Sequence, residues 1–125
     1  MRNRGFTLIE LLITMVIVGL LAAIAMPLFR NQRDRAVQAS MISDLASLAK
    51  AQEGYYYNNG VYAPDVVTVN VNLSPGNSLV INEATTSGWS ATLVHVPTIG
   101  KTCYIYYGGA IPVGSTTSEG VVSCS

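Results

Sequence analysis

The chain has 125 residues, half of them apolar and only 11% charged, and its net charge is zero. This length accommodates one domain of ordinary size rather than two. A balanced charge excludes a broad electrostatic field for nucleic acids or acidic substrates. Much of the apolar surplus lies in the first thirty residues, and the remainder is rich in Ser, Thr, Asn and Gly. The composition therefore indicates a small polar module attached to an apolar segment.

The N-terminal segment is an apolar stretch that carries one acidic residue. Residues 5–29 are almost all apolar, yet Glu10 stands near their leading end, and from Leu11 to Phe29 only Thr14 is polar. About 20 apolar residues suffice to span a bilayer as a helix. A charged side chain at the centre of such a helix costs about 2.5 to 3.5 kcal/mol on insertion scales. We therefore expect Glu10 to have a partner.

Two simpler interpretations of this segment stay open at the level of residue pattern. An ordinary secretory signal would end at a small-x-small site, and residues 23–25 (Ala-Ile-Ala) fit one. The apolar stretch is long for such a signal, and Glu10 would be unusual in its core. The segment could also be a plain single-pass anchor with Glu10 near the lipid headgroups.

The start of the chain resembles the class III signal of type IV prepilins and pseudopilins. The resemblance rests on a short basic leader ending in Gly5, followed by Phe6 and by Glu10 four residues later. It implies that prepilin peptidase cuts after Gly5 and that the same enzyme methylates the Phe6 nitrogen. It also implies three regions: a cytoplasmic leader (1–5), a transmembrane and assembly helix (6–29), and a periplasmic globular head (30–125).

Charge at the two ends of the apolar stretch does not settle the orientation. Arg2 and Arg4 precede the stretch, while Arg30, Arg33 and Arg35 follow it. The numbers of basic residues on the two sides are nearly equal, so the positive-inside rule does not select an orientation. The proposed placement in the inner membrane, with the head outside the cytoplasm, therefore comes from the resemblance.

A long helix is predicted from residue 6 to about residue 53. Pro27 removes a backbone hydrogen bond and Gly19 has low helix propensity, so we expect a bend or local break at these positions and loosening between them on assembly. After the apolar stretch the pattern becomes amphipathic, with one apolar face formed by Val37, Met41, Leu45 and Leu48. Gly54 is a suitable residue to end the helix.

The residues after this helix read as loops and short strands. Turn residues mark 55–65 as a loop, and the alternation in 66–72 predicts a half-buried strand. Further strands are predicted at 79–82, 89–96, 102–107 and 120–124. One helix followed by several antiparallel strands gives an α+β fold in which the sheet packs on the apolar face. This layout resembles the pilin fold.

The two cysteines are Cys103 and Cys124. With one histidine in the chain they do not make a convincing metal site, and no CxxC redox pair is present. A disulfide between them is the simplest use of two cysteines in an oxidising compartment, with two separate buried thiols as the alternative. The pairing resembles the C-terminal disulfide loop of many type IV pilins.

Nothing in the sequence assembles an enzyme or a cofactor site. His95 lies in a predicted strand and is expected to be solvated or hydrogen-bonded there. Asp65, Glu83 and Glu119 are far apart, and no phosphate-binding glycine pattern occurs. We expect no catalysis, no cofactor and no metal.

The resemblance implies that the chain works by polymerising. After cleavage the Phe6 amine could pair with Glu10 of its own chain or with that of a neighbouring subunit, and the family implies the neighbour. The implied partners are other copies in a helical homopolymer, prepilin peptidase, an inner-membrane assembly platform and motor, and membrane lipid before assembly.

Three functions follow, in order of preference. The first is a subunit of a type IV pilus that serves adhesion, twitching motility or DNA uptake, and the second is a pseudopilin of a type II secretion system. The third is a nucleic-acid receptor at a pilus tip. No strong nucleic-acid binding is expected, because Lys101 is the only base beyond the long helix, although tyrosines could stack on single strands.

Overall fold

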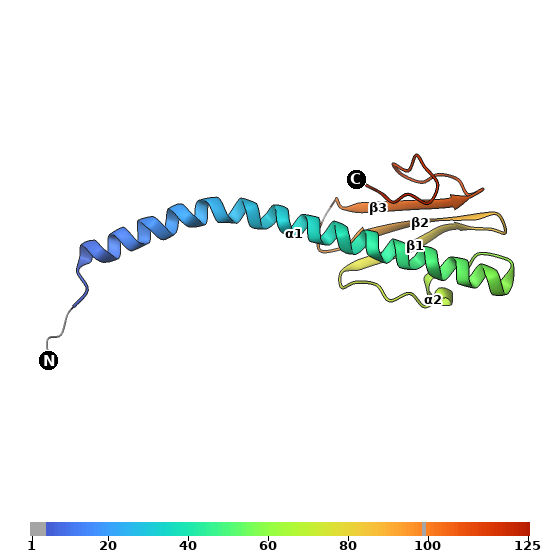
Figure 1. Cartoon of the computed structure of the whole chain (residues 1–125), viewed down its shortest axis with the longest axis horizontal. Coiled ribbons are helices and arrows are strands. Elements are labelled where there is room, and N and C mark those ends of the chain that lie inside the picture. Colours follow the sequence, from blue (N-terminus) through green and yellow to red (C-terminus); the bar gives the residue numbers. More distant parts are fainter. Residues whose placement is uncertain (1–4, 99) are drawn as a thin grey trace. The chain divides into compact units, whose positions relative to one another are not determined.

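The computed structural model describes residues 5–98 and 100–125. These residues form two compact units, one up to Arg35 and one from Ala36 to Ser125. The second unit, called the head below, contains all the strands (Figure 1). The elements are α1 (Leu8–Asn59), α2 (Val66–Val69), β1 (Asn77–Ala84), β2 (Gly88–His95), β3 (Thr102–Gly108) and β4 (Ser123–Cys124).

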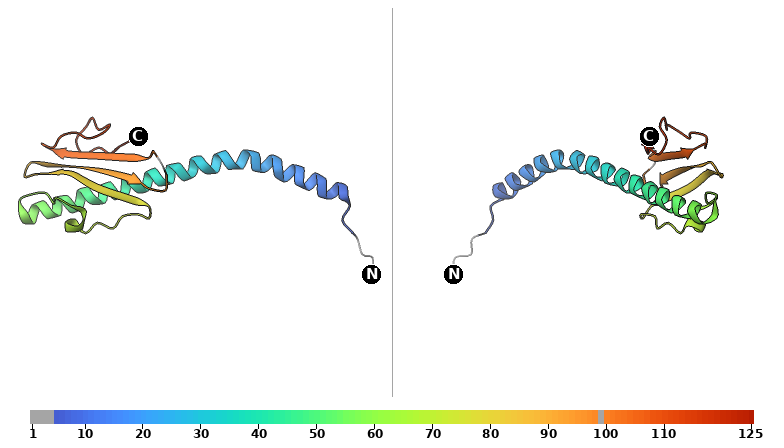
Figure 2. Two further views of the ribbon diagram at one scale, coloured as in Figure 1. Left: turned by 180° about the vertical axis from the view of Figure 1, so that it is seen from behind. Right: turned by 45° about the vertical axis from the view of Figure 1, so that its right-hand side comes forward.

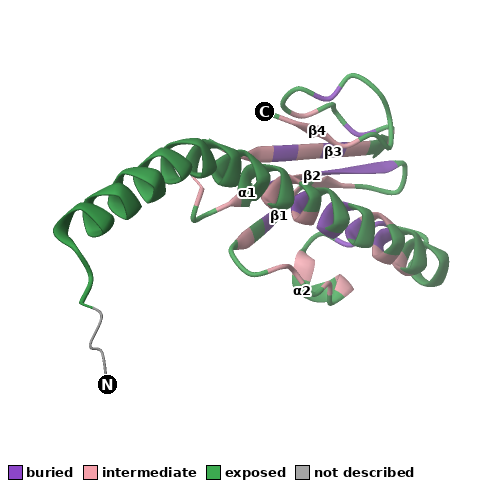
Figure 3. Ribbon diagram, turned by 60° about the vertical axis from the view of Figure 1, so that its left-hand side comes forward, coloured by how far each residue is buried: buried purple, intermediate pink, exposed green. Residues whose placement is uncertain are grey.

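The core of the head lies between α1 and one face of the sheet. Met41, Leu45 and Leu48 are fully buried and pack with sheet residues such as Leu93 and Ile105. Figure 2 shows this part of α1 lying along the sheet, and Figure 3 shows buried residues on both facing layers. The apolar face predicted for the helix is therefore confirmed, and so is the α+β class.

The sheet is antiparallel with the strand order β1-β2-β3-β4. Leu79, Leu93 and Cys103 are consecutive partners across the first three strands, and all three side chains are buried against α1. The pairing of β1 with β2 is irregular between Ile81 and Glu83. Each predicted strand in the region 79–124 overlaps an observed one, and the intervening Gly, Pro, Ser and Thr residues lie in or near the connections between strands.

The helix ends later than the sequence predicts. It continues through Gly54 to Asn59, and Gly60 adopts a left-handed conformation with φ of 71°. The Gly60 N–H donates to the Tyr56 carbonyl at 2.8 Å and so satisfies one of the terminal acceptors of the helix. Gly54 is tolerated inside the helix, and the terminating glycine is the next one along the chain.

The predicted strand at 66–72 is wrong. Residues Val66–Val69 form a short helix, which Asp65 caps by accepting hydrogen bonds from the Thr68 N–H and hydroxyl, both at 2.7 Å. Asn70 then ends it in a left-handed conformation with φ of 49°. The bonds from Thr68 lower the pKa of Asp65, because they favour its charged form. The capping side chains therefore stabilise a helical turn here, in place of the strand that the alternating valines predicted.

No break interrupts α1 at Gly19 or Pro27 in this structure. A proline inside a helix removes one donor and crowds one turn, while the hydrogen bonds on either side remain. The expected loosening of this stretch concerns the assembled state and stays a prediction.

Asp44 is a buried carboxylate that holds the loop before β1. Its side chain is 5% exposed and accepts hydrogen bonds from the Ser74 N–H at 2.8 Å, the Ser74 hydroxyl at 2.9 Å and the Asn77 amide at 2.7 Å. Buried charges are tolerated when hydrogen bonds satisfy them in this way. The amino-acid sequence gives no sign of this role, because the partners of Asp44 lie thirty or more residues further along the chain.

Gln52 fixes the chain where it leaves α1. The fully buried amide donates to the Ala63 carbonyl at 3.0 Å and accepts from the Ala63 N–H at 2.8 Å. Next to it, burial raises the pKa of Tyr62 to about 12, and the nearby Glu53 carboxylate adds to the rise. Tyr62 is therefore a neutral donor to Glu53 at ordinary pH.

Cys103 and Cys124 are joined by a disulfide between neighbouring positions of β3 and β4. This agrees with the predicted pairing. Since β4 has only two residues, the bond holds the C-terminal segment to the sheet edge together with backbone bonds between Thr102 and Ser125.

The first prediction concerns Asp44. Asp44→Ala should lower the free energy of unfolding of the head by about 3 kcal/mol, because three partly buried donors lose the carboxylate that accepts their hydrogen bonds. Asp34→Asn, which removes a charge from an exposed site on the same helix, is the control and should change it by less than about 0.5 kcal/mol. Urea unfolding in detergent measures both. Equal effects would contradict the anchoring role.

The second prediction concerns the disulfide. Replacing both Cys103 and Cys124 by serine should lower the free energy of unfolding by about 3 kcal/mol. The reason is that the unfolded chain is no longer cross-linked between two positions 21 residues apart and gains conformational entropy. The comparison is the same urea experiment on the oxidised chain. A double variant as stable as the oxidised protein would show that the strand pairing alone holds the tail.

Candidate assembly site in the apolar helix

The first unit presents an exposed apolar surface along its described residues. Every described residue from Gly5 to Ala36 is exposed. The large apolar side chains between Phe6 and Phe29 are 50% to 88% accessible. This part of α1 is long and apolar enough to cross a membrane. A surface that is apolar all round needs lipid or other apolar helices as its environment.

Thr7 and Glu10 form a reciprocal cap at the start of α1. The Thr7 N–H donates to Glu10 Oε2 at 3.0 Å, and the Glu10 N–H donates to Thr7 Oγ1 at 3.3 Å. The Thr7 hydroxyl also donates to Oε2 at 2.8 Å. This is the capping box, in which a Thr before the first helical residue and a Glu three positions later satisfy terminal donors. The Thr-x-x-Glu spacing was the available signal, which the sequence analysis did not use.

The cap leaves part of the Glu10 carboxylate available. Both bonds from Thr7 end on Oε2, so among the described residues Oε1 remains open to a further donor. Glu10 thus lies at the positive end of the helix dipole, where a carboxylate is favoured. The side chain can hold its own helix terminus and still accept a proton donor from another molecule.

Gly5 and Phe6 lie just before the helix, and the Phe6 side chain is 82% exposed. A Cβ placed on Gly5 would meet no atom of the described residues, apart from its immediate chain neighbours, within 4 Å. The other residues of the predicted leader, 1–4, lie outside the described residues.

The other residues singled out from the sequence do not form a second site. His95 Nδ1 lies 2.7 Å from the Asn77 side-chain oxygen, so the prediction of a hydrogen-bonded strand histidine is confirmed. Among residues 5–98 and 100–125, no group of three or more His, Cys, Asp or Glu could hold a metal ion. Tyr56 stacks on Tyr62 with ring centroids 4.6 Å apart, which indicates packing at the end of α1.

Comparison with known proteins gives a match at the same end of the chain. The prokaryotic N-terminal methylation motif matches residues 1–26. The chain is 39% identical over 94 residues to the fimbrial protein EcpC of Eikenella corrodens, covering 69% of this chain and 59% of that protein. It is 44% identical over 62 residues to the type IV major pilin protein PilA of Myxococcus xanthus, covering 50% and 28% respectively.

Similarity to secretion proteins is of the same order. The chain is 36% identical over 61 residues to the type II secretion system core protein G of Pectobacterium carotovorum, covering 49% of this chain and 39% of that protein. The chain thus spans less than two thirds of the length of the relatives it matches.

The third prediction tests the cap. Thr7→Ala removes a helix-capping side chain and should destabilise the first turn of α1 by about 1 kcal/mol. Backbone amides of the first turn should then exchange faster with solvent in detergent micelles. The control is Thr14→Ala, because the Thr14 hydroxyl only donates to the Leu11 carbonyl. If both variants changed exchange at the first turn equally, the cap would not be the cause.

Proposed function

We propose that this chain, a type IV pilin or pseudopilin, is the structural subunit of a type IV pilus. It is a homologue of both groups and carries the N-terminal methylation motif. Pilins are structural subunits and not enzymes, in agreement with the expectation of no catalysis. The observation that carries the proposal is Glu10, held by its own helix cap at the leading end of an entirely exposed apolar helix.

Maturation creates the partner of Glu10. Hydrolysis of the Gly5–Phe6 peptide bond frees the Phe6 amine, and transfer of one methyl group to that nitrogen leaves a secondary amine that carries a positive charge at neutral pH. The residues divide accordingly into a leader (1–5), an assembly helix (6–29) and a head (30–125). Each new subunit thereby brings a cation one helical turn from its own acid.

In the filament this cation meets Glu10 of a subunit already incorporated. At 4 Å and an effective dielectric constant of about 20, such a pair gains about 4 kcal/mol before the costs of desolvation. Oε1 receives the neighbour's amine while Oε2 keeps the bond to its own Thr7. The pair sets the axial register of the subunits, and contacts along the apolar helix supply most of the cohesion.

The free energy of transferring the apolar helix from the membrane to the filament is close to zero. Lipid covers the apolar helix before assembly, and sister helices cover the same surface afterwards, so little apolar area is exposed to water overall. An assembly motor and platform in the inner membrane can then drive the exchange. The head lies on the far side of the membrane from the leader, where an oxidising compartment suits the Cys103–Cys124 bond.

A pseudopilin of a type II secretion system is the alternative, favoured by the similarity to core protein G. The disulfide of the C-terminal segment favours the pilus. Glu119 is the only acidic residue between Val113 and Gly120, and it is bound to the Gly108 N–H at 2.9 Å. This segment therefore offers few ligands for an oxygen-rich calcium cage of the kind that often stabilises major pseudopilins.

The fourth prediction separates the charge of Glu10 from its capping role. Glu10→Gln retains a residue that completes a capping box but removes the negative charge. We expect at least a ten-fold loss of fibre yield with leader processing intact, because the amine of the incoming subunit has no counter-ion. Electron microscopy and quantification of sheared fibres measure the yield, and the mass of the chain reports processing.

The matched control is Thr7→Ala, which weakens the cap but keeps the carboxylate and should reduce the yield less. A normal fibre yield from Glu10→Gln would contradict the proposed pairing role of Glu10. Long surface fibres from the unaltered chain support the pilus, whereas fibres confined to the periplasm together with a secretion defect on deletion would support the pseudopilin.

A further inference from the structure

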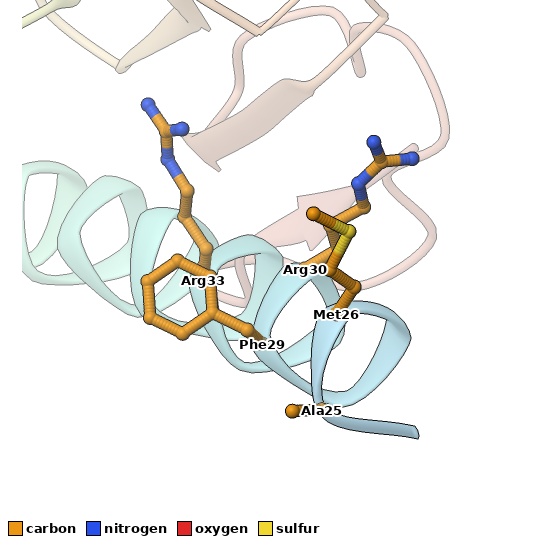
Figure 4. Close-up of a pocket in the computed structure, with 5 residues that line it drawn as sticks. All are labelled: Ala25, Met26, Phe29, Arg30 and Arg33. Carbon is orange, nitrogen blue, oxygen red and sulfur yellow. The ribbon is translucent and has the colours of Figure 1, made fainter. Parts of the chain in front are cut away.

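A groove runs along the end of the apolar stretch between two rows of side chains. Ala25, Phe29 and Arg33 follow one another at intervals of four residues, and Met26 and Arg30 form the adjacent row. Rows with this spacing are the ridges of a helix surface, and the space between them is a natural groove. Figure 4 shows the Phe29 ring beside Arg33 and the Met26 thioether beside Arg30.

The groove is apolar at one end and basic at the other. Ala25, Met26 and Phe29 give it an apolar floor, and each row ends in an arginine. All these side chains are exposed, with Met26 at 68% and Phe29 at 72%. The apolar part belongs to the segment that can cross a membrane, so the two guanidinium groups lie where that segment reaches the polar interface.

We propose that this groove binds an anionic phospholipid from the leaflet on the side of the head. The two guanidinium groups hold the lipid phosphate, because arginine donates paired hydrogen bonds to phosphate oxygens. An acyl chain lies along Met26 and Phe29. The inference rests on the membrane insertion included in the proposed function, and it adds a lipid-binding site to the helix.

The neighbouring charges make the proposal specific. Asp34 follows Arg30 at the same interval of four residues but is not among the residues that line the groove. Its carboxylate opposes binding of an anion. At 3.6 residues per turn, Arg35 points about 140° away from Arg30 and about 160° away from Arg33. Arg35 thus has the same charge at nearly the same depth on the opposite side of the helix.

The test uses the full chain in nanodiscs that contain equal amounts of phosphatidylglycerol and phosphatidylcholine. Native mass spectrometry counts the lipids that stay bound after the disc is released. We expect the unaltered chain to retain phosphatidylglycerol preferentially.

The double variant Arg30→Gln, Arg33→Gln should lose this preference, with at least a five-fold lower retention for each arginine removed. Arg35→Gln should retain the lipid as the unaltered chain does, and Asp34→Asn should retain more.

Three results would overturn the lipid site while leaving the proposed membrane insertion intact. Equal losses in Arg35→Gln and in the double variant would show a diffuse attraction between basic residues and an anionic surface. No preference for phosphatidylglycerol in the unaltered chain would show that the groove does not select the headgroup. Dimers that depend on Arg30 and Arg33 and carry no lipid would show that a second copy occupies the groove. Failure of the chain to enter nanodiscs would instead contradict the proposed membrane insertion, and the lipid site with it.

Discussion

The apolar surface of residues 6–29 is the constraint on which the remaining features depend. Its side chains are exposed on all sides of the helix within the first compact unit, as far as the structure describes it. At about 25 cal/mol for each Å² of apolar surface, such a helix is strongly disfavoured in water. Lipid and a bundle of like helices are the two environments that remove this cost. An acidic residue at the leading end is acceptable in both if it is capped by its own helix and then neutralised by a neighbour.

The head is stabilised separately from this constraint. All members of its core cluster lie between Val37 and Cys124. Asp44 and Gln52 tie α1 to the loops that follow it, and the disulfide holds the C-terminal segment. Because these interactions are internal to the head, the apolar helix can exchange one environment for another without unfolding it. This separation is what a subunit needs if it folds at a membrane and is later transferred into a fibre.

The sequence predicted those parts of the structure that local pattern determines. The spacing of Met41, Leu45 and Leu48 predicted the buried face of α1, and short segments separated by Gly, Pro, Ser and Thr predicted the strands that pack on it. Asp44 and Gln52 were missed, because a polar residue on a helix gives no sign of distant partners. The prediction that the helix ends near Gly54 was wrong, because a glycine can also occur inside a helix, and it is Gly60 that supplies the left-handed position after the last turn.

The error at residues 66–69 has a different cause. Alternating valines and polar residues fit a strand, but Asp65, Thr68 and Asn70 supply the capping and left-handed positions of a helical turn. At the candidate assembly site, the family resemblance identified Glu10. The hydrogen bond between Glu10 and Thr7 was found only in the structure, although the Thr-x-x-Glu spacing is typical of a capping box. The proposed role of Glu10 toward a second subunit would be a property of the assembly, which a single chain does not contain.

The most direct test of this account is the first residue of the protein isolated from cells that produce it. Intact mass and N-terminal peptide mapping identify that residue and any methyl group on it. The account predicts a chain that begins at Phe6 with one methyl group on its nitrogen and retains the entire apolar helix. A chain that begins just after Ala25, with the apolar helix removed as an ordinary secretory signal, would contradict it.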